Sequence, residues 1–435
     1  MSPLLLAVRS TVGALTAPDR EVLFDRATSN DDAIRARTAE IITEVRRGGD
    51  IALRALAERF DQVRLDSLEV PRAACDAALS ALDPALRRAM ERATANIAAV
   101  HAAFKPGTTE ITTVDGVVIG RRPDPLARVG VYAPGGRAAY PSSVLMGAVP
   151  ARVAGVREVI LCSPPGPDGR PSAVVLAAAS LAHVDRVFSL GGAGAIAAMA
   201  YGTESVPVVD RIVGPGNAYV AEAKVQLSSR VAIDSPAGPS ELLVLADESA
   251  NALVIARELL AQAEHDPLAA VVLVTTAPEL ASAVEAELSW LLDEAGRAEI
   301  IRAALAARGA IIVATSLDEA IAFSNAWAPE HLSLMLRTEN EATALDRVRN
   351  AGTVFVGGSA SVAYGDYMTG ANHVLPTGGA ARSYSGLSTL DFVRWTTYQR
   401  IPIAAARSFA EDVGLFADAE GLPAHAAAAR QWSDA

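Results

Sequence analysis

The sequence predicts an α/β fold in which two parallel-sheet domains follow one another along the chain. From Gly116 onward, short apolar runs alternate with Ala-rich runs of helical character. Strands separated by helices in this way are typical of βαβ units, whose strands form a parallel sheet. The alternation divides at the Ala-Gly-Pro-Ser sequence of residues 237–240 into two arrays of similar size, which indicates two domains.

The expected elements can be placed in order. Residues 1–105 are expected to be helical, and Asp83-Pro84 predicts the start of an amphipathic helix that ends near Phe104, because Pro is favoured at the first helical position. After about Arg382 the chain is expected to be helical again, with an Ala-rich tail around His425. The expected strands are Val129–Tyr132, Glu158–Cys162, Arg186–Leu190, Arg211–Val213, Glu241–Ala246, Val271–Thr275, Ile311–Ala314 and Thr353–Val356.

Composition narrows the possible partners. The 435 residues carry 38 basic and 50 acidic side chains, and a net charge of −12 argues against nucleic acid or an anionic membrane as a partner. No apolar run reaches the ~18 residues of a membrane span. Cys75 and Cys162 show no metal or disulfide spacing, and Cys162 falls in a strand predicted to be buried, so we expect a reducing cytoplasm.

Three Gly-rich loops follow predicted strands. Gly192–Ala197 has the place and spacing of a dinucleotide-binding fingerprint, but no acid stands where the fingerprint requires one. Asp210 comes too early and Glu222 lies inside a helical run, so a tight turn explains the motif equally well. The loops Tyr132–Gly136 and Gly214–Asn217 also follow strands, and all three are expected to meet at the carboxyl edge of one parallel sheet, where ligands bind.

Acids and histidines gather between residues 324 and 376. Glu330 and His331 follow Pro329, which marks the end of an element, and element ends often present reactive side chains to a cleft. Asp366 and His373 lie in a Gly-containing polar loop. Each residue alone is explained more readily by a solvated surface charge, but the cluster favours a functional site.

A second pair of polar residues ends a predicted helix. Gln262 and His265 are three positions apart and therefore share a face. The helix dipole alone could stabilise His265 at this end. Alternatively, both are metal ligands with Asp366 and another His, a set that suits Zn²⁺ or a similar ion in a catalytic or substrate-binding role.

At these residues the chain closely resembles the histidinol dehydrogenases, which catalyse the last two oxidations of histidine biosynthesis. The resemblance runs from about Val129 to His425. It is densest in Gly214–Asn217, Asp234–Glu241, Gln262–His265, Pro329–His331, Gly365–Pro376 and Glu420–His425. Several long motifs in the family's order make it specific.

The resemblance implies a role for individual residues. It implies one zinc ion per subunit, held by Gln262, His265, Asp366 and His425. It places Ser240, His373 and Glu420 around a histidinol bound to the zinc. It assigns NAD contacts to Tyr132 and Asn217, and catalysis to Glu330 and His331.

The resemblance also implies an organisation of two Rossmann-like domains. We expect residues 129–239 to form the NAD-binding domain and residues 240–381 the domain with the zinc and catalytic residues. Residues 1–128 are expected to form an N-terminal helical segment that packs with the 240–381 domain. Residues 382–435 are expected to be a helical tail that crosses to the partner subunit of a homodimer, so that Glu420 and His425 serve the partner's site.

These residue types suit a four-electron oxidation of L-histidinol to L-histidine through the aldehyde. With an ordinary pKa near ~6.5, His331 is suited to take the alcohol proton while hydride passes to NAD⁺. Glu330 can then activate water for attack on the aldehyde, and a second hydride passes to a second NAD⁺. In this scheme zinc positions the substrate and does not generate hydroxide.

Three residues depart from the family pattern. Gly194 stands where a Gln commonly contacts NAD, and it cannot make the hydrogen bonds of an amide. Met368 and Ala371 stand where smaller or polar residues are usual, beside Asp366 and His373. The departures affect cofactor affinity or pocket shape, whereas the ligand and catalytic residues are intact.

Three other functions remain open at this stage. A related dehydrogenase could oxidise another amino alcohol or a polar diol with the same residues. A zinc hydrolase could use Glu330 to activate water without a nicotinamide cofactor. A non-catalytic metal-binding or scaffold protein is disfavoured, because Glu330 and His331 are both present.

Overall fold

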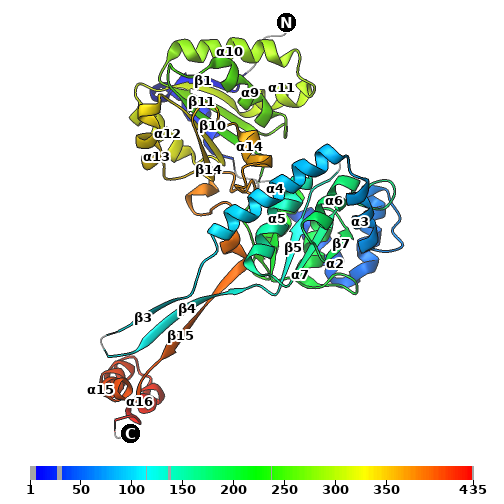
Figure 1. The fold of residues 1–435 in the computed structure, drawn as a ribbon. Coiled ribbons are helices and arrows are strands. Elements are labelled where there is room, and N and C mark those ends of the chain that lie inside the picture. Colours follow the sequence, from blue (N-terminus) through cyan, green and yellow to red (C-terminus); the bar gives the residue numbers. More distant parts are fainter. Residues whose placement is uncertain (1–5, 27–31, 114, 136–138, 237, 434–435) are drawn as a thin grey trace.

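The computed structural model describes residues 6–26, 32–113, 115–135, 139–236 and 238–433, which form two lobes and a long arm (Figure 1). Each lobe contains one six-stranded sheet, and a three-stranded antiparallel sheet forms the arm. The predicted α/β class with two parallel-sheet domains is confirmed. Gly136 and Ala237, which belong to predicted loops, lie outside the described residues.

The first lobe has helices on both faces of its sheet. The strand order is β2-β7-β6-β5-β8-β9, and only β2 runs antiparallel to its neighbour. The strands are β2 (Glu69–Val70), β5 (Arg128–Tyr132), β6 (Glu158–Ser163), β7 (Arg186–Ser189), β8 (Arg211–Val213) and β9 (Ala232–Ile233). One face is covered by α3 (Arg72–Ala81), α4 (Pro84–Ala103), α5 (Pro141–Ala154) and α6 (Ala173–Leu181). The other is covered by α2 (Asp32–Leu56), α7 (Gly192–Tyr201) and α8 (Ala218–Leu227).

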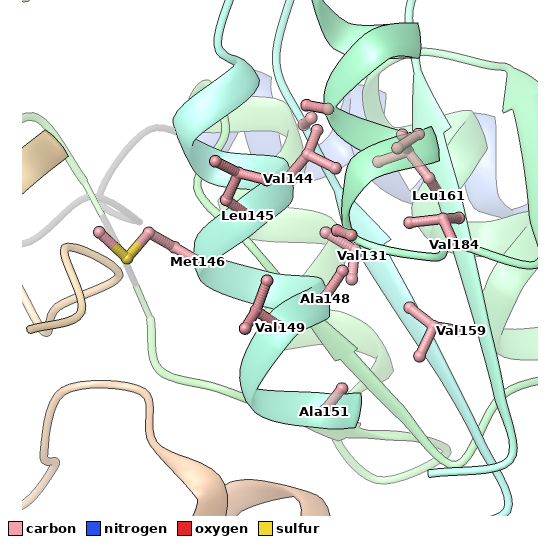
Figure 2. Packing of buried hydrophobic residues seen from close by; sticks show 14 of the residues in the cluster. Val131, Val144, Leu145, Met146, Ala148, Val149, Ala151, Val159, Leu161 and Val184 are labelled. Atoms are coloured by element: carbon pink, nitrogen blue, oxygen red, sulfur yellow. The ribbon is translucent and has the colours of Figure 1, made fainter. Parts of the chain in front are cut away.

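Apolar strands explain why helices cover both faces. On one face, alternate residues of β5 and β6 pack under α5, as Figure 2 shows for Val131, Val159 and Leu161. Burying each such side chain contributes about 1.5–3 kcal/mol. Gly147 lets α5 lie close to β5, because a Cβ at this position would lie 2.7 Å from Cγ1 of Val131. This packing fixes the position of α5, which carries Ser143.

The second lobe has an entirely parallel sheet of order β1-β12-β11-β10-β13-β14. The strands are β1 (Val8–Thr11), β10 (Glu241–Ala246), β11 (Ala270–Thr275), β12 (Gly309–Val313), β13 (His331–Met335) and β14 (Thr353–Val356). The helices are α1 (Ala17–Phe24), α9 (Ala252–Ala263), α10 (Pro278–Leu292), α11 (Ala298–Arg308), α12 (Leu317–Trp327), α13 (Thr338–Arg347) and α14 (Val362–Tyr367). All eight predicted strands are present within one or two residues of their expected ends. The sequence did not predict β13, because the buried polar residues His331 and Ser333 interrupt its apolar pattern.

The N-terminal segment divides between the two lobes. β1 pairs with β12, and α1 contacts α11 in the second lobe. In contrast, α2, α3 and α4 pack against the helices of the first lobe. The prediction that all of residues 1–128 pack with the 240–381 region is therefore wrong. The expectation that residues 1–105 are all helical is wrong at β1 and β2, which each pair with the edge of a sheet. The apolar faces of α2 to α4 are buried against α5 to α8, as Ile41, Leu53 and Ile97 illustrate.

The arm extends away from both lobes (Figure 1). It consists of β3 (Thr109–Thr112), β4 (Val118–Pro125) and β15 (Val393–Arg400), paired in the order β15-β4-β3. At its far end lie the two terminal helices, α15 (Ile403–Ala419) and α16 (Pro423–Arg430). The predicted tail of residues 382–435 is helical only from Ile403 onward. Val393–Arg400 form the strand β15, which pairs with β4 and connects the helices to the first lobe. The remaining short elements of the described residues are three 3₁₀ helices, η1 (Val12–Ala14), η3 (Ala380–Arg382) and η4 (Thr389–Phe392), and one π-helical turn, η2 (Ala57–Asp61).

Two expectations from composition can be compared with the structure. Cys75 and Cys162 are both free and buried, and Cys162 lies in β6 as predicted. Among the described residues, no helix is both long and apolar enough to cross a membrane.

A buried ion pair joins the N-terminal segment to the start of β10. Nη1 of Arg26 lies 2.6 Å from Oε2 of Glu241, and both side chains are almost fully buried. The guanidinium of Arg26 also stacks 3.6 Å above the ring centroid of Trp327, and Oε1 of Glu241 accepts a hydrogen bond of 2.8 Å from the Gly378 N–H. Burial raises the pKa of Glu241 to about 7 even though Arg26 opposes the shift.

Arg26→Met should lower the free energy of unfolding by about 3–5 kcal/mol at pH 8, because it leaves the Glu241 carboxylate buried without a cation. A carboxyl whose pKa is raised on folding costs no stability below its unfolded pKa, and the cost grows as the pH rises through the folded value. The deficit should therefore be smaller at pH 5 than at pH 8. Urea unfolding at both pH values measures it.

Two variants control this prediction. Arg26→Met combined with Glu241→Gln should recover part of the loss at pH 8, because no buried charge remains. Arg9→Met removes an exposed pair with Glu285 and should cost no more than about 1 kcal/mol. An equal deficit for Arg26→Met at pH 5 and pH 8 would contradict the assignment of the loss to the Glu241 charge.

Candidate active site

Glu330 and His331 lie where α12 ends and the chain enters the second sheet. Ala328 closes α12 in the left-handed region at φ 55°, Pro329 follows, and His331 is the first residue of β13. Only 6% of Glu330 and 4% of His331 is exposed. Because β13 lies beside β10, both side chains are close to Glu241, the residue that Arg26 anchors.

The main chain of Glu241 holds both side chains. Its N–H donates a 2.7 Å hydrogen bond to Oε2 of Glu330, and its carbonyl oxygen lies 3.0 Å from Nδ1 of His331. A carbonyl oxygen only accepts hydrogen bonds, so the His331 contact places a proton on Nδ1. In the neutral imidazole, Nε2 is then left with its lone pair.

Asp366 lies on the other side of His331. Its Oδ1 is 3.8 Å from Nε2 of His331, while Oε2 of Glu330 is 3.4 Å from Nδ1. Burial opposes a positive charge on His331, but these two carboxylates outweigh it and raise the pKa of His331 to about 10. The imidazole is thus a charged partner of two acids when nothing else engages Asp366.

His373 connects the two lobes at this point. Its Nδ1 lies 3.0 Å from the main-chain oxygen of Asp366, and its Nε2 lies 3.4 Å from Oγ of Ser143 on α5 of the first lobe. Burial lowers the pKa of His373, which keeps this imidazole neutral. The neighbouring Asn372 also reaches α5, donating a 2.8 Å hydrogen bond to the Met146 carbonyl.

Two other predicted zinc ligands lie at the end of α9. Gln262 is buried in the last turn of α9, and His265 follows the helix end, half-buried. Burial would raise the pKa of Asp366, but His331, His373 and His265 together lower it below its usual value. In the described part of the chain, no group of three or more His, Cys, Asp and Glu side chains has the geometry of a metal site.

These residues lie at the amino edge of the second sheet. Glu241 and His331 begin their strands, Ser240 directly precedes β10, and His265 precedes β11. The rule that ligands bind at the carboxyl edge of a parallel sheet applies to the Gly-rich loops of the first lobe but not here. Because His373 contacts Ser143, the site lies against α5 of the first lobe, at the boundary between the lobes.

The first lobe has a cavity of about 620 Å³ at the carboxyl ends of its strands. Its lining includes Tyr132 and Asn217, the two predicted NAD contacts, together with Gly192 and Gly194. The three Gly-rich loops therefore meet as predicted. The hydroxyl of Tyr132 accepts a 3.1 Å hydrogen bond from the Gly192 N–H, and burial raises the pKa of this phenol.

A buried ion pair holds the loop that leads from Gly214 to Asn217. Asp234 accepts a 2.8 Å hydrogen bond from the Gly214 N–H and forms an ion pair with Lys224, which also donates to the Gly214 carbonyl at 3.1 Å. Gly214 has φ 115°, and a Cβ there would lie 2.1 Å from the Tyr132 carbonyl oxygen, so only Gly fits. Asn217 caps α8 through its Oδ1, which leaves its amide nitrogen as a donor.

Gly194 lines the same cavity and contacts α2. A Cβ at this position would lie 3.0 Å from Cδ1 of Leu56 and 3.7 Å from Cδ2 of Leu53. A larger side chain would require Leu56 to shift. Where the family commonly has Gln, this chain thus has a Gly that the apolar side chains of α2 approach closely.

Two predicted site residues lie far from this cluster within one chain. Glu420 and His425 are exposed, and they belong to the helical pair at the end of the arm (Figure 1). The structure therefore places nine of the eleven predicted site residues in two groups, and these two belong to neither. Seven lie at the amino edge of the second sheet, and two line the cavity of the first lobe. The seven are Ser240, Gln262, His265, Glu330, His331, Asp366 and His373, and the two are Tyr132 and Asn217.

Sequence reasoning missed three residues that shape the site. Glu241 was visible only as the start of a strand, although its main chain holds Glu330 and His331. Ser143 and Arg26 come from segments assigned to other parts of the fold. No local motif marks either one, since their role depends on contacts between distant segments.

Comparison with known proteins agrees with the geometry. The family model described as histidinol dehydrogenase matches residues 24–432. The histidinol dehydrogenase of Methanosarcina barkeri is 46% identical over 95% of this chain and 94% of its own length, and that of Xylella fastidiosa is 49% identical over 94% and 95%. The crystal structure of histidinol dehydrogenase from Elizabethkingia anophelis matches with a TM-score of 0.93 at 34% identity, covering 100% of this chain and 99% of that one. The chain belongs to the histidinol dehydrogenase family.

Proposed function

We propose that this chain oxidises L-histidinol to L-histidine through the aldehyde, using two NAD⁺, one zinc ion per subunit and a site shared between two subunits. The observation that carries the proposal is the cluster at the amino edge of the second sheet. There His331 lies 3.4 Å from Glu330 and 3.8 Å from Asp366, and His373 contacts the main chain of Asp366.

His331 is the proton acceptor in this proposal. The Glu241 carbonyl fixes its Nδ1–H, so Nε2 is the atom that takes the hydroxyl proton when hydride leaves the carbon for NAD⁺. With Asp366 charged and unengaged, the pKa of about 10 would keep His331 protonated at neutral pH. A cation bound to Asp366 would weaken one of the two carboxylate contributions that raise the pKa of His331 and so favour its neutral form.

Glu330 is the group that activates water for the second half of the reaction. Its Oε2 is held by the Glu241 N–H, which leaves Oε1 to accept a proton from water as the oxygen attacks the aldehyde carbon. The resulting hydrate loses its second hydride to a second NAD⁺ and becomes the carboxylate. Water supplies the added oxygen, and the protons leave through Glu330 and His331.

The side chains present fit a zinc site that needs one more ligand. Gln262, His265 and Asp366 offer an amide oxygen, an imidazole and a carboxylate, all of which bind Zn²⁺. His425 would complete the set from the partner subunit. The bound ion would orient the amino alcohol and retain the aldehyde between the two oxidations.

The terminal helices support a homodimer. Around them, large apolar side chains are exposed, including Ile403, Leu415 and Phe416, of which Phe416 is 76% exposed. An apolar groove of about 550 Å³ lies between α15 and α16, lined by Ile401, Phe409 and Trp432 among others. Exposed apolar surface of this kind is typical of a subunit interface. A second copy of the chain would cover it and bring His425 to Asp366.

His331→Asn should lower the rate of histidinol oxidation by about 10²–10⁴-fold, because no base remains for the alcohol proton. Zinc content should stay close to that of the wild type. Glu330→Gln keeps an oxygen for the Glu241 N–H, so it should spare the alcohol step and slow aldehyde oxidation by about 10²-fold or more. Single-turnover NADH formation from histidinol and from histidinal separates the two steps. Equal losses in both steps for Glu330→Gln would refute this division of roles.

The shared site can be tested by combining two inactive variants. In a heterodimer of a His331→Asn and a His425→Asn subunit, crossed tails make one of the two sites intact. That site combines His331 of the His425→Asn subunit with His425 of the other subunit, so activity should recover to about half that of the wild type. Without crossing, each site keeps one defect and no activity returns. Heterodimers purified through two different affinity tags should be compared with the same homodimers mixed just before assay.

A further inference from the structure

An unpaired acid lies in the wall of the first-lobe cavity. Asp61 lines the cavity at the end of η2, and no described residue offers its carboxylate a hydrogen bond or an ion pair. Burial raises the pKa of Asp61 to about 6, so the carboxylate is still largely charged at pH 7. Asp61 is thus a half-buried charge without a partner in the described part of the chain, and charged groups of this kind in a cavity often serve a ligand.

The two acids that sequence position offered for the dinucleotide are engaged elsewhere. Oδ2 of Asp210 accepts hydrogen bonds of 2.9 Å from the N–H groups of Ala127 and Arg128. Glu222 is buried within α8 and accepts from Gln226 at 2.8 Å. Neither lines the cavity, whereas Asp61 does. The acid that lines this cavity thus comes from the N-terminal segment.

The chemistry of a carboxylate limits what Asp61 can bind. An ionised carboxylate only accepts hydrogen bonds, and it repels phosphate groups. In a dinucleotide, the two adjacent hydroxyls of a ribose are donors whose spacing suits two carboxylate oxygens. A ribose that carries a 2′-phosphate would bring two negative groups together.

The position of Asp61 selects one of the two riboses. Asp61 follows α2, which covers the α7 and α8 face of the first sheet. The Glu330–His331 site contacts the opposite face, where α5 carries Ser143. Since the nicotinamide must reach that site, the adenosine half of the cofactor is the half that lies near Asp61.

We propose that the Asp61 carboxylate accepts hydrogen bonds from the adenosine ribose hydroxyls of NAD⁺ and excludes the 2′-phosphate of NADP⁺, and so sets the cofactor choice of this chain. The inference rests on the proposed NAD⁺-dependent function. Arg37 also lines the cavity, with Nη1 2.5 Å from Oε2 of Glu40. The cavity wall thus also carries a cation that suits a 2′-phosphate, and removing the Asp61 charge removes the opposing repulsion.

Calorimetric titration of the zinc-loaded enzyme at pH 8 tests this role without turnover. The probes are NAD⁺, NADP⁺ and the NAD⁺ analogue that lacks the adenosine 2′-hydroxyl. Asp61→Asn should weaken NAD⁺ binding by about 10-fold or more, the loss expected for a hydrogen bond to a charged group. The ratio of the NADP⁺ to the NAD⁺ dissociation constant should fall by at least about 10-fold. The variant should also lose the wild-type preference for NAD⁺ over the deoxy analogue.

Controls separate this role from a structural one. Glu58→Gln changes an acid in the same turn that pairs with Arg64 at 3.2 Å and does not line the cavity, so all three affinities should be unchanged. Without nucleotide, Asp61→Asn should melt at or above the wild-type temperature, because it removes an unpaired charge; a lower melting temperature would contradict the unpaired state.

Two further outcomes would overturn the proposal in different ways. If Asp61→Asn keeps the wild-type preference for NAD⁺ over both NADP⁺ and the deoxy analogue, Asp61 does not bind this ribose. If the wild type binds none of the three probes, the proposed NAD⁺-dependent function fails as well.

Discussion

The imidazole of His331 lies between two carboxylates, and the rest of the site depends on this arrangement. Glu330 and Asp366 are 3.4 Å and 3.8 Å from its two nitrogens, in surroundings where burial opposes any charge. The two carboxylates raise the pKa of this imidazole, with Glu330 the larger cause. In the proposed function, a cation bound to Asp366 would reduce the part of this shift that comes from Asp366.

The fold places this cluster by joining segments that are distant in the sequence. Arg26 anchors Glu241 from the N-terminal segment, Glu241 holds Glu330 and His331 through its main chain, and Ser143 meets His373 from the first lobe. The cavity of the first lobe is built similarly, because α2 and η2 line it together with the Gly-rich loops.

Much of the fold follows from sequence because it depends on local patterns. Apolar runs between Ala-rich helices predict the two sheets, and Asp83-Pro84 predicts the start of α4. The Gly-rich loops predict the cavity that contains Tyr132 and Asn217, since the carboxyl ends of parallel strands meet at one edge.

The rest depends on long-range packing that no local pattern records. The helices α2 to α4 have apolar faces that would suit either sheet, and the sequence alone does not say which one they cover. β13 is hidden because His331 and Ser333 are buried polar residues within it. Asp61 is one acid among many in the N-terminal segment until the fold places it in the cavity.

The most direct test of the account is the stoichiometry of the reaction. Purified zinc-loaded protein would be given L-histidinol and excess NAD⁺, and NADH would be measured against histidinol consumed. The account predicts two NADH for each histidinol, with L-histidine as product, loss of activity with a chelator and recovery with zinc. One NADH with release of the aldehyde, or no NADH from a folded and metal-loaded protein, would contradict it.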